Sequence, residues 1–277
     1  MDLINVRSSA WLEGMAAPAV DGPFGRLQRA RIQGVSALVT PSWALDCGVE
    51  TTAWTAELEA AVLAAMRDHR SRVAVYDLPA GMPLAAEPFK GWFVERHTRI
   101  ADLASSLPKH RLKQARKAQR LGMRVDFGRN DVPQMVKLHQ LARDRKSIPS
   151  DAAALTKLLM RLAEAPGTQQ VFVVDGADRT VAGGLFLSTR PGQVLYAFGG
   201  AERTAHSGLA TVLLLVEAMQ RAAEAGKHQF DFGGSQDPGV DQFYREFGGE
   251  KVLKYRGILC PPIFRPWLRM RRPDLFP

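Results

Sequence analysis

Apolar and polar residues follow two repeating patterns along the chain, which predict strands and helices in turn. Short runs rich in β-branched and aromatic residues, bounded by Gly, Pro or Asp, are typical of strands. Apolar residues spaced three and four apart are typical of helices. In the first third of the chain these patterns predict one or two strands at 27–39, strands at 72–79 and 91–100, and a helix at 55–69 with Thr55 as its N-cap.

From Ser105 onward the pattern becomes more regular. A basic helix is predicted at 105–122, starting near Ser105 or Ser106 and ending at Gly122. The elements that follow are predicted as a strand at 123–128, helices at about 131–146 and 151–164, a meander of strands at 170–174, 180–188 and 194–198, a helix at 209–225, a strand at 228–232, a helix at 240–247 and a strand around 253–259. The fold class expected is α/β (α+β), with a mixed, mostly antiparallel sheet flanked by helices.

Composition narrows the class of protein. With 277 residues, of which 46% are hydrophobic, the chain can fill a core and is long enough for two domains. No run approaches the roughly 18 to 20 apolar residues of a membrane-spanning helix, and no secretory signal is evident at the start. Cys47 and Cys260 match no metal or redox spacing, and neither do the six histidines. We therefore expect a cytoplasmic protein with two free thiols and no metal site.

The net charge of +9 is unevenly spread. Residues 1–95 carry eight Lys and Arg against eleven Asp and Glu, whereas residues 96–277 carry 29 against 17. Such an asymmetry indicates that the second region faces an anionic partner, such as the phosphates of a cofactor, an RNA or a lipid. We accordingly divide the chain into a small α+β region at 1–95 and a larger domain at 96–277.

Three short motifs carry the candidate chemistry. Ser207-Gly208-Leu209-Ala210 opens the long apolar helix, and a helix start offers free N–H groups to an anion; alternatively, Ser207-Gly208 merely caps a core helix. In FYREFGGE (243–250), Tyr244 is either a proton donor or an aromatic on a buried helix face. In FDFGGS (230–235), Asp231 points away from Phe230 and Phe232, either into a cleft or as a cap for the following turn.

The order of elements and these motifs resemble the GNAT superfamily of acyltransferases. GNAT proteins carry a Q/R-x-x-G-x-G/A loop at the corresponding helix start, and Gly208-Leu209-Ala210 matches its second half. Ala205 stands where the family has Gln or Arg, a role that Arg203 would take over. The resemblance implies that the acyl donor lies between the strands at 194–198 and 228–232. Backbone N–H groups from Phe198 and Gly199 to Ala201 would then stabilise the oxyanion, and Tyr244 would protonate the leaving group.

A closer resemblance is to the Fem-type branch of this superfamily and its acetyltransferase relatives. It rests on the FDFGGS segment and on the basic helix, while Gly249 replaces the usual aromatic of the family signature. Fem-type proteins have two GNAT-like domains, which would make residues 1–95 a degenerate half. The helical coiled-coil insertion of the tRNA-using members is absent from the sequence. The resemblance implies acyl-CoA or, alternatively, aminoacyl-tRNA as the donor.

Two basic segments indicate further partners. The helix contains six cations in twelve residues without an acid: Lys109, Arg111, Lys113, Arg116, Lys117 and Arg120. A surface without mixed charge favours a phosphate-rich partner such as tRNA, although a solubilising face is the alternative. The C-terminal Arg265, Arg269, Arg271 and Arg272 surround Trp267, as at an anionic membrane surface or on RNA.

These observations leave three hypotheses. The first is an acyl-CoA-dependent transferase acting on the amine of a small molecule or peptide, and the second is an aminoacyl-tRNA-dependent transferase that forms peptide bonds. The third is a non-catalytic GNAT-like module that binds nucleic acid or membrane. For either enzyme the base that deprotonates the amine is open between Asp231, Glu202 and a relayed water. The acyl group, the acceptor and the oligomeric state are not specified by the sequence.

Overall fold

The computed structural model describes residues 3–15, 17–148, 150–234 and 237–275, which form two compact units. Unit 1 contains Met1–Ile4, Ser8–Gly14 and Arg99–Lys251, and unit 2 contains Asn5–Arg7, Met15–Thr98 and Val252–Pro277. The long segment of unit 1, Arg99–Lys251, is entered along strand β5 (Trp92–Asp102) and left along strand β11 (Glu250–Leu259). The division at residues 95 and 96 stays a prediction.

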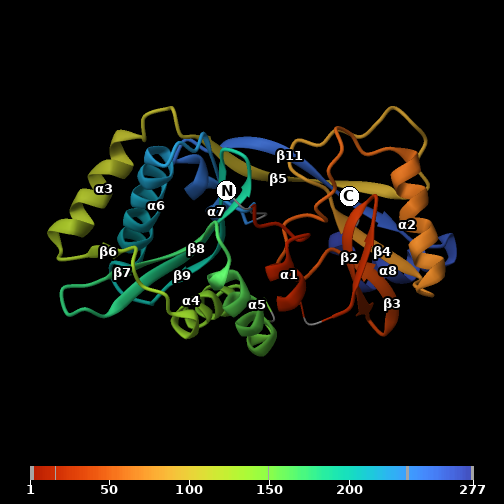
Figure 1. Cartoon of the computed structure of the whole chain (residues 1–277), viewed down its shortest axis with the longest axis horizontal. Coiled ribbons are helices and arrows are strands. Elements are labelled where there is room, and N and C mark those ends of the chain that lie inside the picture. The colour runs from red at the N-terminus through yellow and green to blue at the C-terminus, as the bar shows by residue number, and fades with distance from the viewer. Residues whose placement is uncertain (1–2, 16, 149, 235–236, 276–277) are drawn as a thin grey trace. The chain divides into compact units, whose positions relative to one another are not determined.

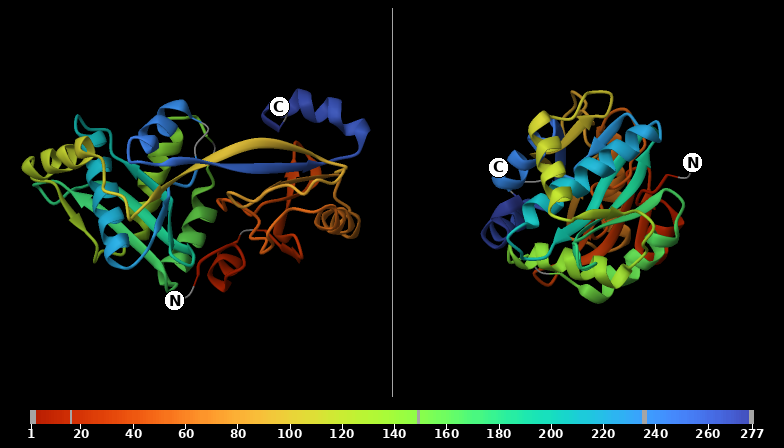
Figure 2. Two further views of the ribbon diagram at one scale, coloured as in Figure 1. Left: turned by 90° about the horizontal axis from the view of Figure 1, so that it is seen from above. Right: turned by 90° about the vertical axis from the view of Figure 1, so that its left-hand side faces the viewer.

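Unit 1 is built on a sheet with helices on both faces. Its strands lie in the order β6-β7-β8-β9-β10-β5, antiparallel except for β9 and β10. Its elements are α1 (Ser9–Gly14), α3 (Lys109–Arg120), β6 (Arg124–Asp126), α4 (Val132–Asp144), α5 (Ala152–Glu164), β7 (Thr168–Val174), β8 (Thr180–Arg190), β9 (Gln193–Ala201), α6 (Ser207–Glu224), β10 (Gln229–Asp231) and α7 (Pro238–Arg245). Figures 1 and 2 show α3 and α6 on one side of the strands and α4 and α5 on the other.

Helix α6 is the centre of the unit 1 core. Leu213, Leu214 and Leu215 are all fully buried, although consecutive residues point in different directions around a helix. The helix is buried on several sides because it lies between the sheet and α3. This packing fixes both ends of α6, including the start that the sequence marks as a candidate anion site.

The ends of the basic helix follow the sequence only in part. The structure starts α3 at Lys109 with Pro108 as its N-cap, so the expected start at Ser105 or Ser106 is wrong. Pro108 has φ −56° and ψ 131°, an extended conformation that stops the helix from reaching further back. At the other end, Gly122 has φ +82°, the left-handed conformation predicted for a residue that ends a helix.

The strands of unit 2 lie in the order β1-β2-β3-β4-β11-β5. Its own elements are β1 (Ala19–Gly22), β2 (Gly25–Ile32), β3 (Val35–Val39), α2 (Ala56–Asp68), β4 (Val73–Asp77) and α8 (Arg265–Arg271). Leu58 and Val62 of α2 pack on one face with Leu38, whereas Leu268 of α8 packs on the other with Val75. Thr55 caps α2 as predicted, accepting a hydrogen bond from the Leu58 N–H group at 3.3 Å.

The two units repeat one order of elements. In each, three antiparallel strands (β1–β3 or β7–β9) lead into a helix and then into a strand parallel to the third, β4 or β10. The strand that pairs antiparallel with this last one comes from the other part of the chain, β11 for β4 and β5 for β10. Each sheet is thus completed by a strand that begins in the other unit. No helix among the described residues is long and apolar enough to cross a membrane.

Candidate active site

Strands β9 and β10 run parallel and then part. They pair over three residues, from Gln193 with Gln229 to Leu195 with Asp231, where β10 ends while β9 continues to Ala201. Directly afterwards Gly233 adopts φ +82°, and a side chain there would lie 2.8 Å from the Tyr196 carbonyl oxygen. The chain therefore turns away close to β9, which leaves the later residues of β9 without a neighbour from β10.

A bulge lies at the point of parting. Tyr196 pairs with Phe186 of β8 and Phe198 pairs with Leu185, so Ala197 has no partner in the register. A bulge redirects side chains and strengthens the local twist of a strand. Alternate N–H groups of Phe198, Gly199 and the residues that follow point toward the open side, because strand amides alternate in direction.

The start of α6 is open to solvent. Gly208 is exposed, and a side chain at this position would meet no atom within 4 Å. Within the described chain, the N–H groups of Gly208 and Leu209 have no hydrogen-bond acceptor, whereas Ala210 donates to the His206 carbonyl oxygen at 3.0 Å. Two free amides at the positive end of an 18-residue helix form a suitable site for phosphate oxygens.

The neighbouring residues that the sequence predicts to bind an anion differ in whether they are free to do so. The Ser207 hydroxyl faces its own loop, where it accepts from the Thr204 N–H group at 2.8 Å and contacts the Glu202 carbonyl oxygen. Its side chain is thereby committed to the preceding loop and does not cap the helix, because His206 is the N-cap residue and no side chain of the described residues makes a cap hydrogen bond there. Arg203 is exposed and close in sequence to the free amides. Ala210 is fully buried, and it contributes to the site only by anchoring the first turn of α6.

Phe198 and Gly199 contribute backbone rather than side chains. The Phe198 ring is 2% exposed and packs edge-on against His139 of α4, with ring centroids 5.3 Å apart. Burial lowers the pKa of His139 to about 4, with a further lowering from Arg143 and an opposing effect of the Gly199 backbone. His139 is therefore a neutral side chain beneath this part of β9.

Tyr196 belongs to the site although the sequence gave no sign of it. Its ring stacks on Phe186 and leans over Gly184 and Gly199, where any side chain would overlap it. Burial raises the pKa of its hydroxyl, as does the nearby Tyr244, so the phenol stays protonated. Only the bulge and the two glycines bring this hydroxyl to the open part of β9, and a single sequence does not reveal such a register.

Tyr244 lies at the same opening. Its ring stacks on Phe232 at 4.7 Å between centroids and 18° between planes. Burial raises the pKa of the hydroxyl to about 12, and the negative charge of Asp231 adds to the effect. A phenol with this pKa is fully protonated near neutral pH and can give its proton to a leaving group.

Asp231 is a buried carboxylate, 6% exposed, at the end of β10. It accepts a hydrogen bond from the Gly233 N–H group at 2.9 Å, so it stabilises the turn that follows. The structural interpretation of this residue thus has direct support, and its charge also acts on Tyr244. Ser235 of the FDFGGS segment lies outside the described residues.

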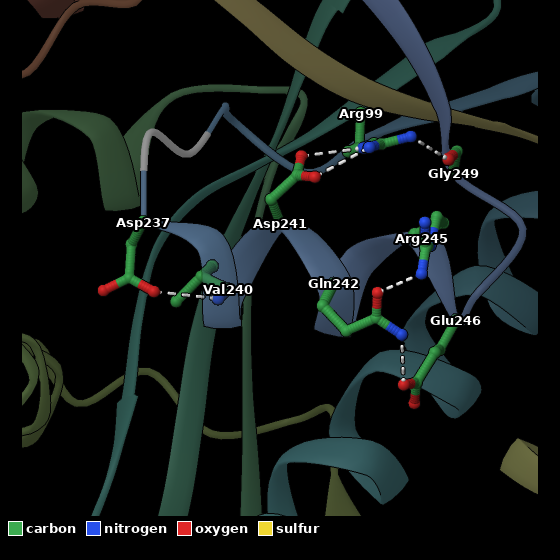
Figure 3. Close-up of polar contacts among 8 residues, drawn as sticks. All are labelled: Arg99, Asp237, Val240, Asp241, Gln242, Arg245, Glu246 and Gly249. Atoms are coloured by element: carbon green, nitrogen blue, oxygen red, sulfur yellow. Dashed lines mark hydrogen bonds and ion pairs between the residues drawn. The ribbon is translucent and has the colours of Figure 1, made fainter.

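Helix α7, which carries Tyr244, is held to β5 by an ion pair. Figure 3 shows both carboxylate oxygens of Asp241 accepting from Arg99, at 2.8 and 2.7 Å, while Arg99 also donates to the Gly249 carbonyl oxygen. Asp237 caps the helix by accepting from the Val240 N–H group at 3.0 Å. These contacts set the position of α7 relative to the strand that completes the unit 1 sheet.

The basic helix does not present all six of its cations to solvent. Arg111 is 4% exposed, lies over the rings of Phe243 and Phe247, and pairs with Glu246 at 2.5 Å. Arg111 therefore packs into the α7 aromatic cluster and, of the six cations counted in the basic run, does not face a phosphate-rich partner. The other five are exposed and have no acidic partner among the described residues: Lys109, Lys113, Arg116, Lys117 and Arg120.

The remaining candidate base is also engaged. Glu202 pairs with Lys137 of α4 at 2.7 Å. No group of three or more His, Cys, Asp or Glu side chains in the described ranges is arranged to hold a metal ion.

Comparison with known proteins agrees with the fold of unit 1. A family model described as an acetyltransferase (GNAT) domain matches residues 109–245. Among solved structures, FemX is similar with a TM-score of 0.61 at 11% identity, covering 94% of each chain. L-PGS from Bacillus licheniformis is similar with a TM-score of 0.61 at 14% identity, covering 96% of this chain and 95% of its own. No curated protein matches the sequence.

Proposed function

Starting from a chain whose residues 109–245 belong to the acetyltransferase (GNAT) superfamily, we propose that the protein transfers an acyl group from acyl-coenzyme A to the amine of a small molecule or peptide. One observation carries the proposal. Strands β9 and β10 part beside the open start of α6, with Tyr244 at the opening.

The free amides of Gly208 and Leu209 would bind the pyrophosphate of the donor, with Arg203 as a flanking cation. The Ser207 and Ala210 side chains would serve this loop indirectly, by holding its conformation. The acyl thioester would then lie along the unpaired part of β9, at Phe198 and Gly199. Of these two residues, the one whose N–H group faces the open side of β9 would stabilise the negative oxygen that develops on the carbonyl, since neighbouring strand amides point in opposite directions.

The chemistry follows directly. The amine nitrogen attacks the thioester carbonyl carbon, the carbon–sulfur bond breaks, and Tyr244 gives its proton to the departing thiolate. The proton lost by the amine passes to a relayed water, because Glu202 pairs with Lys137. Asp231 takes part by holding the turn after β10.

Substitution of Gly208 tests this donor site. Gly208→Glu places an anion in open space at a helix start, where a negative charge favours folding but repels phosphate. Calorimetric titration with coenzyme A should show at least tenfold weaker binding, with unchanged or higher thermal stability. Gly208→Gln is the matched neutral control and should retain most of the affinity. Equal affinity for both variants and the wild type would refute a phosphate site at α6.

Aminoacyl-tRNA is the second candidate donor, in keeping with the resemblance to the Fem-type branch. The five exposed, unpaired cations of α3 favour it, since such a surface attracts the phosphates of a nucleic acid. If charged tRNA stabilises the protein against heat and acetyl-CoA does not, aminoacyl-tRNA takes the place of acyl-CoA as the proposed donor. Binding of RNA without turnover, unaffected by Tyr244→Phe, would instead support the non-catalytic module.

The C-terminal segment supplies a candidate membrane contact. Ile263 and Met270 are 82% and 70% exposed, and Arg269 and Arg271 are exposed beside them. Apolar tips among cations favour an anionic lipid surface. Sedimentation with vesicles containing phosphatidylglycerol, compared with phosphatidylcholine alone, tests this partner.

A further inference from the structure

A second cavity, of about 510 Å³, lies in unit 1 apart from the parting of β9 and β10. Its walls come from the loop after β6 at Phe127–Asn130, the start of β7 and the last turns of α6. Its volume falls within the range of about 300 to 1,000 Å³ that is usual for small-molecule sites. Nothing in the acyl-transfer chemistry requires it.

The cavity is remote from the proposed donor site. On α6 it is lined by Ala218, Ala222 and Ala225, and the first of these lies eleven residues beyond Ser207. At 1.5 Å per residue this separation is roughly 16 Å along the helix axis. The three small side chains leave space above Phe186 and Val194, which supply apolar wall.

The charged side chains that line the cavity are all positive. Arg129, Arg221 and Lys227 contribute to it, and no Asp or Glu does. Arg129 is committed, because it donates to Asp131 and Thr180. Arg221 has no carboxylate partner among the described residues, and its guanidinium lies 4.6 Å from the centre of the Phe127 ring. A guanidinium stacked in this way keeps its N–H donors available at its edge for a carboxylate.

Neutral polar groups border the cavity on the other face of the sheet. The Thr168 hydroxyl is buried and has no hydrogen-bond partner among the described residues. Gln170 nearby is fixed, since its side chain accepts from the Asp131 N–H group at 3.0 Å and contacts Asn130. Thr168 pairs with Leu187, so its side chain lies on the opposite face of the sheet from Phe186 and takes no part in holding a ligand against Phe186 and Ala222.

We propose that this cavity is a second binding site, which takes a small organic anion with an apolar body of about the size of a phenyl ring. The carboxylate pairs with Arg221, and the body lies against Phe186 and Ala222. One effect opposes this choice: the C-terminal end of α6 carries a partial negative charge, which favours a cation. The experiment therefore compares an anionic probe with a cationic probe of the same shape.

Calorimetric titration with 4-phenylbutyrate, 4-phenylbutanol and 4-phenylbutylamine separates charge from shape. The acid should bind at least tenfold more tightly than the alcohol, and the amine should bind most weakly. Arg221→Gln should weaken the acid about tenfold and leave the alcohol unchanged, because it removes one charged hydrogen bond. Arg116→Gln, on the exposed face of α3, is the matched control and should change nothing. Equal binding of the three probes, tighter binding of the amine, or no binding would overturn the proposal.

A larger side chain that fills the cavity tests whether the probes bind there. Ala222→Phe should abolish binding of all three probes, and Ala225→Leu serves if circular dichroism shows that the first variant does not fold. Saturating coenzyme A should leave the affinity for 4-phenylbutyrate unchanged, and displacement would overturn the proposal by placing the probe in the donor site. Because the probes need no acyl donor, this result is independent of the proposed transferase activity.

Discussion

At the scale of single residues, the site depends on two phenols held in their protonated form. Tyr244 and Tyr196 come from α7 and β9, and burial raises the pKa of both. The sequence identified the first through a motif and missed the second. A motif reports residue types at a fixed spacing, whereas the place of Tyr196 depends on a bulge and on the absence of side chains at Gly184 and Gly199.

Removal of one hydroxyl tests the assignment of the acid. Tyr244→Phe should lower kcat about 100-fold, the usual contribution of general acid catalysis, with little change in KM for the donor. The stack on Phe232 does not need the hydroxyl, so thermal stability should be retained. Steady-state kinetics with an acyl-CoA donor measures the effect. Tyr255→Phe, in unit 2, is the control, and a similar loss there would rule out a specific role for Tyr244.

His139 should make folding sensitive to mild acid. Its folded-state pKa of about 4 lies below the ordinary 6.5, so the unfolded chain takes up the proton first as pH falls. Stability should therefore decline between about pH 6.5 and 4, by up to about 3 kcal/mol, and change no further below that range. Urea unfolding of the wild type and of His139→Gln measures this, with the exposed His206→Gln as control. If His139→Gln keeps the full pH dependence, another group is responsible.

At the scale of elements, local patterns predicted most helices and strands, and tertiary contacts decided the rest. Thr55 and Gly122 act locally, so their roles were predictable. The run of six cations did not reveal that Arg111 is buried, because this residue packs against Phe243 and Phe247, more than a hundred residues later. The short elements α1 and β1 escaped prediction because six and four residues give too little periodicity.

Two of the ion pairs at α7 should differ in their contribution to the free energy of unfolding. Arg99 and Asp241 are 12% and 22% exposed at their side chains, whereas Lys146 and Asp237 are 37% and 43% exposed. Arg99→Ala should lower the free energy of unfolding by about 2 kcal/mol, between the costs for surface and fully buried pairs. Lys146→Ala, as the matched control, should cost less than about 1 kcal/mol. Urea denaturation at pH 7 compares them, and equal losses would contradict the ranking by burial.

At the scale of the whole molecule, the excess positive charge belongs mainly to residues 96–277, and the structure exposes part of it as an unpaired face on α3. Both the net charge and the basic helix that carries this face were predictable from the sequence, whereas the burial of Arg111 was not. The repeat of one element order in both units was likewise hidden, because the sequence predicted only a possible degenerate half. Strand pairing joins residues far apart in the chain, so periodicity alone does not reveal it.

The exposed cations of α3 should contribute more to RNA binding than an equal number of cations elsewhere on the protein. Lys113→Glu with Lys117→Glu should reduce the salt dependence of tRNA binding, lowering the slope of log K against log salt by about two. The same double reversal at Lys157 and Arg161 of α5, also four residues apart, is the control and should have a smaller effect. Filter binding over a range of salt concentrations measures both. Equal effects would show attraction to net charge only.

The exchange of β5 and β11 between the units has a consequence for synthesis. Unit 1 has all its strands once residue 251 has been made, including the end of β5 that pairs with β10. Strand β4, although translated much earlier, pairs with Arg256–Leu259 and has an exposed edge until those residues leave the ribosome. The half of the protein that is made first is therefore finished last, and a stalled or truncated chain would present that edge to other chains.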